Sequence, residues 1–223
     1  CYICLRKRQF MQKLKDITPE NIAHLEQVVG NLCRACIVTH IHPDGDALGS
    51  SLGLYSFLKS LGKECKIVLP SAMPSTLSFI FDENSLKDVV CAGENEAGGE
   101  VEAAFNEADV VFALDFNKPD RIGKVESLFK DNKSTKIMID HHQEPLTDGF
   151  YLVFSDPNMS STAEYVYHIL LATKFVQGDS ARIPLQGCTA LLTGMTTDTN
   201  NFANSVIPTT FPMATDLLAR AIF

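Results

Sequence analysis

The sequence predicts an α/β fold, in which a doubly wound, mostly parallel sheet is covered by helices on both faces. Two features of the sequence lead to this prediction. Short runs that are apolar throughout alternate with longer segments in which apolar residues recur every three or four positions, as buried strands and helices with one apolar face require. Strands and helices also alternate along the chain, which is the order that produces parallel strands joined by helical crossovers.

The first half of the chain contains two well-marked helices. A threonine that can serve as N-cap, followed by a proline, starts the helix predicted over 18–32. A second helix over 48–61 has its apolar residues at helical spacing and stops at Gly62. The other predicted elements here are strands over 35–39, 65–69 and 88–91 and helices over 75–81 and 101–108.

The second half of the chain contains the clearest strand, which is DVVFAL over 109–114. Ser161 and Glu164 form the Ser-x-x-Glu pattern of a capping box, in which each side chain bonds a backbone N–H at the start of a helix. The remaining predicted elements are a helix over 121–130, strands over 136–139 and 151–154, a helix over 185–195, and a last helix that begins near Thr209 and runs to the end of the chain.

Acidic residues and histidines follow several of these elements. Because the ligand site of a doubly wound fold lies beyond the carboxyl ends of its strands, we expect these side chains to meet at one rim. Carboxylates that converge there repel one another, and bound cations are the natural compensation. The residues concerned are His40, Asp44, Asp46, Asp115, Asp140, His141, His142 and Asp198.

The chemistry of these side chains indicates which metal they bind. Four carboxylates and two imidazoles from this set, without a thiolate, favour six-coordinate Mn²⁺ or Mg²⁺ over tetrahedral structural Zn²⁺. Six side chains are too many for one ion that keeps a water, but they suit two ions that share a bridging carboxylate. Such a pair is typical of enzymes that activate water for attack on phosphorus.

Four segments resemble the motifs of the DHH phosphoesterase superfamily, in the same order. They read THIHPDGDALGSSLG, ALDFNKPDRIG, IDHHQEP and GMTTDTNNF. The resemblance covers most of the chain from about residue 18 onward. PDGDALGS together with SSTAE is similar to the bacterial nanoRNase and phosphoadenosine-phosphate phosphatase branch, which is RecJ-like. Family-two pyrophosphatases share the metal motifs but usually read DTDS where this chain reads DGDA.

The resemblance implies a site for two Mn²⁺ ions, with Mg²⁺ as the alternative metal. Asp115 would bridge the two ions, His142 would contact the scissile phosphate and assist the leaving group, and Asp140 would orient the histidines from behind. The six implied metal ligands are His40, Asp44, Asp46, Asp115, His141 and Asp198.

Three further residues are candidates for binding substrate. Ser160 and Ser161 precede a predicted helix, whose free N–H groups form an anion site, although simple helix capping explains them equally well. Arg121 is either a phosphate ligand or an exposed arginine on a helix. Gly45 and Gly49 are interpreted as allowing a tight backbone turn beneath the metals. Three other histidines, His24, His42 and His168, are given no role in the site.

The chain divides into three parts at the sequence level. Residues 1–17 are expected to form a poorly ordered N-terminal extension, and 18–206 the DHH catalytic domain. Residues 207–223 are expected to begin a helix that leads to a C-terminal domain outside this sequence. Apolar residues of that helix would then be exposed and would allow a homodimer; they are Phe211, Met213, Leu217, Leu218, Ile222 and Phe223.

The formal net charge of −8 argues against a protein that coats duplex DNA, because such binding requires many contacts with phosphates. Without an apolar run long enough for a membrane or a secretory signal, a cytoplasmic location is expected. The predicted function is a Mn²⁺-dependent phosphoesterase that cleaves short single-stranded oligonucleotides, as an exoribonuclease, or 3′-phosphoadenosine 5′-phosphate. The alternatives are a polyphosphate or pyrophosphate hydrolase, and a fragment that binds metal and nucleotide without turnover.

Overall fold

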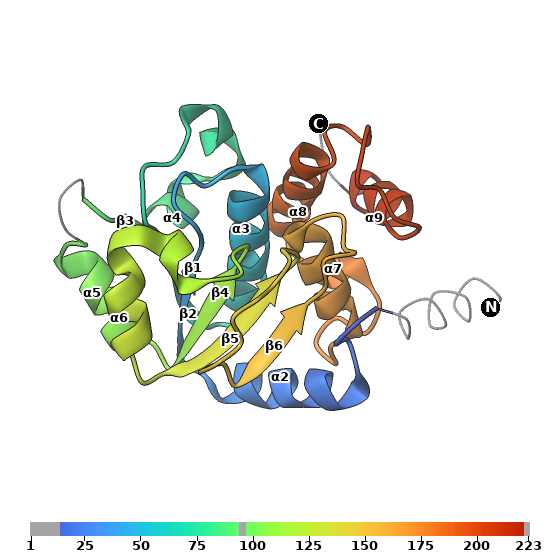
Figure 1. The fold of residues 1–223 in the computed structure, drawn as a ribbon. Coiled ribbons are helices and arrows are strands. Elements are labelled where there is room, and N and C mark those ends of the chain that lie inside the picture. The colour runs from blue at the N-terminus through green and yellow to red at the C-terminus, as the bar shows by residue number, and fades with distance from the viewer. Residues whose placement is uncertain (1–13, 94–96, 221–223) are drawn as a thin grey trace.

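Six strands form one sheet in which every neighbouring pair is parallel (Figure 1). The structure is a computed structural model that describes residues 14–93 and 97–220. The parallel sheet confirms the predicted α/β fold class. The strands are β1 Arg34–Val38, β2 Glu64–Leu69, β3 Val89–Cys91, β4 Val110–Leu114, β5 Thr135–Asp140 and β6 Leu152–Ser155.

The strand order is β3-β2-β1-β4-β5-β6, so the chain reverses direction across the sheet between β1 and β4. In doubly wound sheets, ligands bind in the crevice that forms at such a reversal, beyond the carboxyl ends of the two strands. Val38 of β1 pairs with Ala113 of β4. His40 and Asp115 each come two residues after this pair, so both enter the crevice at the same level.

Helices cover both faces of the sheet (Figure 1). Ile37 packs on one side with α2, α3, α7, α8 and α9, whereas Cys36 and Val38 pack on the other with α5 and α6. The helices are α2 Pro19–Asn31, α3 Gly45–Ser60, α4 Glu83–Leu86, α5 Gly99–Asn106, α6 Glu126–Asp131, α7 Thr162–Ala172, α8 Leu185–Asp198 and α9 Thr210–Leu218, with 3₁₀ turns η1 Ser75–Ile80, η2 Pro119–Val125 and η3 Ser180–Arg182.

Helices α3 and α8 pack unusually closely because glycines face one another across their interface. A Cβ added to Gly49 would lie 2.5 Å from the Ala190 carbonyl oxygen, and one added to Gly45 would lie 2.2 Å from Thr197 Oγ1. These glycines therefore admit the neighbouring helix and do not make the tight turn expected from the sequence. The close packing brings the end of α8 beside the start of α3.

Three predicted helices differ from the observed ones. The helix over 121–130 is divided into η2 and α6, because Gly123 adopts a left-handed conformation with φ of 53°. The helix over 185–195 continues to Asp198, which is therefore its last residue and does not lie beyond it. The last helix, α9, ends at Leu218.

Residues 14–17 pack against the rest of the protein, so the expectation of poor order does not hold for them. Ile17 belongs to the core, and a carboxylate oxygen of Asp16 accepts a hydrogen bond of 3.2 Å from the Ser155 N–H. The remaining part of the expected N-terminal extension, residues 1–13, lies outside the described residues. The proposed catalytic domain thus begins its packing a few residues earlier than residue 18.

The C-terminal helix α9 packs on α7 and α8. Met213 and Leu217 are buried there, contrary to the expected exposed patch, whereas Phe211 and Leu218 are exposed. Ile222 and Phe223 lie outside the described residues. Since the exposed apolar area is smaller than expected, the homodimer stays a proposal with less support from this helix. Within the described chain, no helix is long and apolar enough to cross a membrane.

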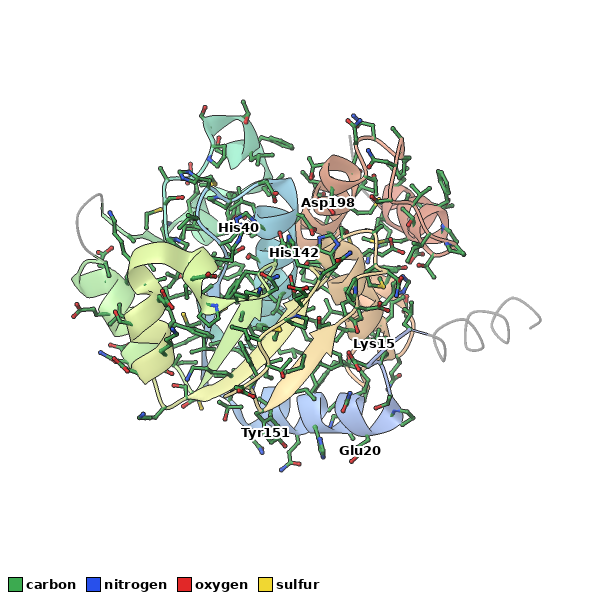
Figure 2. All side chains as sticks on the ribbon, viewed as in Figure 1. Lys15, Glu20, His40, His142, Tyr151 and Asp198 are labelled. Atoms are coloured by element: carbon green, nitrogen blue, oxygen red, sulfur yellow. The ribbon has the colours of Figure 1, made fainter. Side chains whose placement is uncertain are left out.

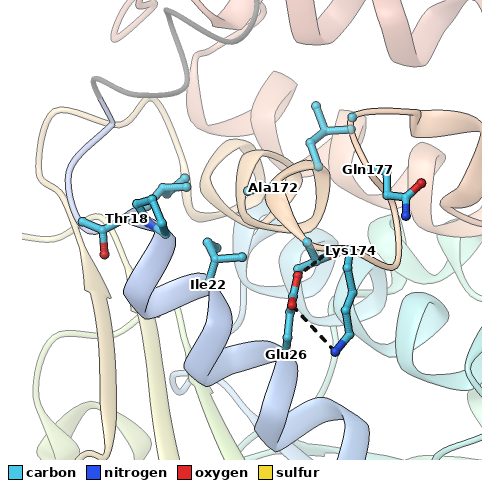
Figure 3. A pocket seen from close by; sticks show the side chains of 11 residues that line it. Thr18, Ile22, Glu26, Ala172, Lys174 and Gln177 are labelled. Atoms are coloured by element: carbon cyan, nitrogen blue, oxygen red, sulfur yellow. Dashed lines mark hydrogen bonds and ion pairs between the residues drawn. The ribbon is translucent and has the colours of Figure 1, made fainter.

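A pocket of about 850 Å³ lies between α2 and the C-terminal end of α7 (Figure 3). Glu26 of α2 accepts a hydrogen bond from the Lys174 backbone N–H and lies 3.7 Å from the Lys174 ammonium group. The pocket is at the opposite end of α7 from the predicted metal ligands. The pocket is therefore separate from the cluster of predicted metal ligands.

Candidate metal centre

The predicted site residues gather at the carboxyl edge of the sheet. Figure 2 shows His40, His142 and Asp198 at this edge, while Glu20 and Tyr151 lie toward the opposite one. Their elements differ: His40 follows β1, His142 follows β5, and Asp198 ends α8. The topology of the sheet therefore brings together residues that are far apart in the sequence.

His40 is buried beside two carboxylates. Its Nε2 lies 3.5 Å from Asp115 Oδ2 and 3.9 Å from Asp44 Oδ1. Its Nδ1 lies 2.8 Å from the Ile41 carbonyl oxygen, and a hydrogen bond there leaves the lone pair on Nε2, facing the carboxylates. Burial lowers the pKa of His40, but the hydrogen bonds with Asp115 and Ile41 outweigh it and raise the pKa above its ordinary value.

Asp44 and Asp46 begin helix α3. The Asp44 side chain is the N-cap and accepts bonds of 3.0 Å from the N–H groups of Asp46 and Ala47. Asp46 is buried and turns toward α7, where its carboxylate accepts bonds of 2.6 Å from Thr162 N–H and 2.8 Å from Ala163 N–H. Burial and the nearby charges raise the pKa of Asp46 well above its usual range, despite these two bonds.

Asp115 occupies the centre of the cluster. It has a left-handed backbone with φ of 62°, and the Thr162 hydroxyl donates a bond of 2.8 Å to its Oδ1. A left-handed conformation is uncommon outside glycine, although aspartate tolerates it better than most residues. Burial opposes ionisation, but the hydrogen bond with His40 and the charge of His141 hold the pKa of Asp115 below its usual value.

The two adjacent histidines have different surroundings. His141 Nε2 lies 3.4 Å from Asp198 Oδ2 and 3.8 Å from both Asp46 Oδ2 and Asp115 Oδ1. His142 instead places Nδ1 2.7 Å from Asp140 Oδ1, and its side chain is 40% exposed. The hydrogen bond that the His142 ring donates to Asp140 raises the pKa of His142, while burial lowers it to a smaller extent.

Asp140, which the resemblance implies orients both histidines from behind, contacts only His142. Asp140 is fully buried and bonds both the ring and the backbone N–H of His142. His141 Nδ1 lies 3.3 Å from the Met159 carbonyl oxygen instead. Each ring is thus fixed through Nδ1 by its own partner, and Nε2 is the nitrogen available for other contacts.

The six predicted ligands form two groups of three. His40, Asp44 and Asp115 make one, and the other is made by the triad Asp46, His141 and Asp198; within each, donor atoms lie within 4.8 Å of one another. Burial raises the pKa of Asp198, as it does for Asp46, so the cluster carries uncompensated acidic groups. Oxygen and imidazole donors with unmet negative charge fit hard divalent cations.

A third possible group combines His142 with Asp115 and His141. The His142 atom near Asp115 is Nδ1, which lies 3.9 Å from Oδ1. That atom is already bonded to Asp140 at 2.7 Å. The geometry therefore favours His142 as a residue that faces a substrate over His142 as a metal ligand.

Ser160 and Ser161 are buried and bonded within the protein. Ser161 is the N-cap of α7 and accepts a bond of 2.9 Å from Glu164 N–H, while Ser160 donates to the Glu164 carboxylate. The N–H groups that follow bind the Asp46 carboxylate. The anion at this helix N-terminus is therefore Asp46 itself, and the expected substrate contact of the two serines remains a prediction without a supporting contact.

Glu164 departs from the predicted capping box. Its carboxylate accepts hydrogen bonds from Ser160, from Thr209 and, at 2.7 Å, from Thr210, and lies 3.3 Å from His168 Nε2. None of these contacts closes the box at the start of α7. Glu164 instead joins α7 to the residues that start α9.

Arg121 and the remaining histidines differ in how they relate to the His/Asp cluster. Arg121 is exposed, and its charge lowers the pKa of His142. His42 has a left-handed backbone, and its N–H donates a bond of 2.6 Å to Ser71 Oγ. His24 lies on α2 with its ring 6.0 Å from that of Tyr151. His24 and His168 therefore lie outside the cluster, as the sequence indicates.

Thr162 is the residue of this region that sequence reasoning missed. It lies in the SSTAE segment, but the sequence draws attention to its neighbours as caps. Only the structure shows that Thr162 contacts Asp46 and Asp115, which come from α3 and from the end of β4. No local pattern in the sequence predicts such contacts between distant segments.

Residues 34–195 match the family described as the DHH family, N-terminal domain. The chain belongs to the DHH family. This match lies inside the predicted catalytic domain of 18–206 and includes five of the six predicted metal ligands. Asp198, the sixth, comes from the end of the same helix, α8, in which the match stops.

Known DHH relatives and similar structures include proteins with several activities. The bifunctional oligoribonuclease and PAP phosphatase NrnA of Thermus thermophilus is 36% identical over 83% of this chain and 50% of the relative. The cyclic-di-AMP phosphodiesterase PdeA of Listeria monocytogenes is 26% identical over 86% of this chain and 29% of the relative. An exopolyphosphatase-related protein from Bacteroides fragilis has a TM-score of 0.84 and 32% identity, covering 92% of this chain and 58% of that one.

The chain spans about half the length, or less, of the curated DHH relatives it matches. The family match over 34–195 spans the six strands and all of the predicted metal ligands except Asp198. The printed activities of the relatives belong to proteins that are longer than this sequence.

Proposed function

We propose that this chain is a metal-dependent phosphoesterase that cleaves short single-stranded oligonucleotides or 3′-phosphoadenosine 5′-phosphate. The observation that carries the proposal is the pair of triads around Asp115, with His142 beside them. Family membership and the 36% identity to NrnA support a nucleotide substrate. Two bound divalent ions, Mn²⁺ or Mg²⁺, would polarise phosphoryl oxygens and lower the pKa of water.

Each side chain has a definite part in this proposal. One triad would hold one ion, the second triad the other, and Asp115 would contact both, because its Oδ2 lies near His40 and its Oδ1 lies near His141. Asp44 is the most exposed of the ligands. The two ions together would offset the acidic charge of the cluster.

His142 would donate a proton to the oxygen of the leaving group. Asp140 holds the ring through Nδ1, so Nε2–H is available to a substrate. Because Asp140 raises the pKa of His142, the ring keeps its proton to a higher pH than an isolated imidazole. Arg121, whose charge lowers the pKa of His142, would bind a phosphate oxygen of the same substrate.

A substrate comparison tests the proposal. Phosphate or nucleotide release is measured with Mn²⁺ on 3′-phosphoadenosine 5′-phosphate, a diribonucleotide, a cyclic dinucleotide, pyrophosphate and polyphosphate. We expect turnover of the first two substrates above that of the others. Faster release from polyphosphate would favour the inorganic alternative, for which the 32% identity to the exopolyphosphatase-related protein is the supporting observation. Metal binding without release from any substrate would favour a binding role.

A further inference from the structure

Thr162 contacts a carboxylate from each of the two triads. It is the first residue of α7 and is fully buried. Its backbone N–H donates a bond of 2.6 Å to Asp46 Oδ2, and its hydroxyl donates a bond of 2.8 Å to Asp115 Oδ1. Asp46 and Asp115 belong to different triads and to different segments of the chain. Thr162 therefore contacts both triads at once.

The position of Thr162 at the start of a helix frees its hydroxyl for this contact. Within a helix, a threonine hydroxyl commonly bonds the carbonyl oxygen of the preceding turn, as Thr193 of α8 does with Thr189 at 2.9 Å. Thr162 has no preceding helical turn, because Ser161 is the N-cap. Its hydroxyl therefore turns to Asp115, and a proton donor in that place leaves the carboxylate its other lone pairs for a cation.

The first turn of α7 is itself held in place from two sides. Ser161 caps it by accepting a bond from the Glu164 N–H. Glu164 in turn is bound by Ser160 and by the two threonines at the start of α9. Thr162 is consequently a fixed point against which the two carboxylates are oriented, and these contacts are buried from water.

We propose that Thr162 is a positioning residue, whose hydroxyl and N–H hold Asp115 and Asp46 at the separation that two divalent ions require. The inference rests on the proposed two-ion site. It adds a residue that does not touch the ions and that acts through the carboxylates. Partners of this kind orient metal ligands in many proteins, and their loss typically weakens metal binding about 10- to 100-fold.

Mn²⁺ titration calorimetry on the chain, with Mn²⁺ alone as the ligand, tests the inference. Thr162→Val keeps the shape of the side chain and removes the hydroxyl, and we expect binding of at least one ion to weaken about 10- to 100-fold. Thr162→Ser keeps the hydroxyl and should bind as the wild type does. Thr162→Ala lacks both the methyl group and the hydroxyl, so comparison with Thr162→Ser isolates the hydroxyl if Thr162→Val does not fold.

Thr173→Val is the matched control, because it removes a buried hydroxyl at the other end of the same helix. Wild-type Mn²⁺ affinity is expected for it. Electron paramagnetic resonance of bound Mn²⁺ gives a second readout, since altered spacing of the ions in Thr162→Val changes the spin coupling between them.

The outcomes separate this inference from the proposal beneath it. If the wild type binds no pair of Mn²⁺ ions, the two-ion site is wrong. If the wild type binds two ions and Thr162→Val binds them equally well, only the role of Thr162 is overturned. Weak binding by Thr162→Ser, or by the Thr173→Val control, would likewise overturn it, because the hydroxyl at residue 162 would then not be the cause.

Discussion

At the scale of single residues, His141 and His142 show how one strand end supplies two functions. Both follow β5, which ends at Asp140. His141 directs Nε2 toward Asp198, Asp46 and Asp115, whereas His142 is bonded through Nδ1 to Asp140 and remains partly exposed. The first ring therefore has the surroundings of a ligand, and the second has those of a proton donor.

His141→Ala and His142→Ala should therefore fail in different ways. His141→Ala should weaken Mn²⁺ binding, and excess Mn²⁺ should restore part of the activity. His142→Ala should keep Mn²⁺ binding but slow turnover by about 10²- to 10⁴-fold, with the smallest loss for an activated aryl phosphate, whose leaving group needs no proton. Calorimetry and steady-state kinetics measure the two effects.

His24→Ala is the control for these variants, because His24 lies on α2 outside the cluster. It should leave both Mn²⁺ affinity and turnover unchanged. The roles of the adjacent histidines are reversed if His142→Ala abolishes metal binding and His141→Ala does not.

Local sequence explains some side chains better than others. The gathering of the predicted ligands is predictable because most of them follow a strand or begin the helix after one, and the carboxyl ends of parallel strands meet at one edge of the sheet. The contacts of Glu164 are not predictable in this way, because three of its partners form contacts that compete with the capping box. These partners are His168, Thr209 and Thr210. Thr209 and Thr210 lie far from Glu164 in the sequence, and only tertiary packing decides between the two arrangements.

At the scale of elements, the buried Glu164 carboxylate links α7 to the start of α9. Burial disfavours its charge, but the hydrogen bonds from His168, Ser160 and Thr209 outweigh that effect and hold the pKa of Glu164 below its ordinary value. A carboxylate whose pKa is lowered by folding stabilises the native state above the pKa it has when unfolded. This stabilisation is lost as the pH falls through the lower, native pKa.

Glu164→Gln should therefore reduce stability in a pH-dependent manner. At pH 7 we expect a loss of about 1.5–3 kcal/mol in the free energy of unfolding, as for a hydrogen bond to a charged group. The difference from the wild type should shrink as the pH falls below about 4, where glutamate is protonated in the unfolded chain. Thermal unfolding of both proteins across this range measures it, and a difference independent of pH would contradict the assignment.

The contact between α3 and α8 depends on small residues. A Cβ on Gly49 would lie 2.5 Å from a backbone oxygen and 2.8 Å from Gly194 Cα. Because α8 ends at Asp198, any displacement of α8 from α3 also moves a metal ligand. Packing of these two helices and geometry of the centre are thus linked.

Gly49→Ala should consequently lower both stability and metal affinity. Overpacking of a close interface typically costs about 1–3 kcal/mol, and Mn²⁺ binding should weaken because Asp198 shifts. Gly30→Ala is the matched control: Gly30 lies within α2 with nothing near its missing Cβ. That variant should be neutral or stabilising by about 0.5–1 kcal/mol. Unfolding in urea and Mn²⁺ titration distinguish the two, and a fully stable Gly49→Ala would disprove the close packing.

Element boundaries are predictable where apolar runs are short and bounded, as for the strand predicted over 35–39 and observed as Arg34–Val38. Helix boundaries are less predictable where a glycine breaks a helix, as Gly123 does between η2 and α6. The predicted exposure of α9 is wrong for Met213 and Leu217, because the apolar face of this helix packs on α7 and α8 and both residues are buried there. Periodicity identifies an apolar face, but it does not identify the surface that covers it.

At the scale of the whole molecule, we expect the acidic cluster to make stability depend on bound cations. Burial raises the pKa values of Asp46 and Asp198, so these carboxylates are held near one another at a cost. Ions that bind the native cluster and not the unfolded chain shift the equilibrium toward the native state.

Chelation should therefore lower the melting temperature, and added Mn²⁺ should raise it. At a free metal concentration of 100 times the dissociation constant, each independent ion contributes about 2.7 kcal/mol. Differential scanning calorimetry with chelator, and with increasing Mn²⁺, measures the shift. The double variant Asp46→Asn and Asp115→Asn should lose this dependence on metal, and an identical response of the wild type and that variant would contradict a centre at these residues.

The chain must pair β1 with β4 before the metal centre exists, since the reversal of strand order lies between these two strands. The centre also needs α8 docked on α3, because Asp198 comes from the last residue of that helix. Long-range pairing of parallel strands is slow compared with the formation of local structure. We therefore expect capture of the ions to be a late step of folding, so that metal binding would report on the completed fold and not on its early intermediates.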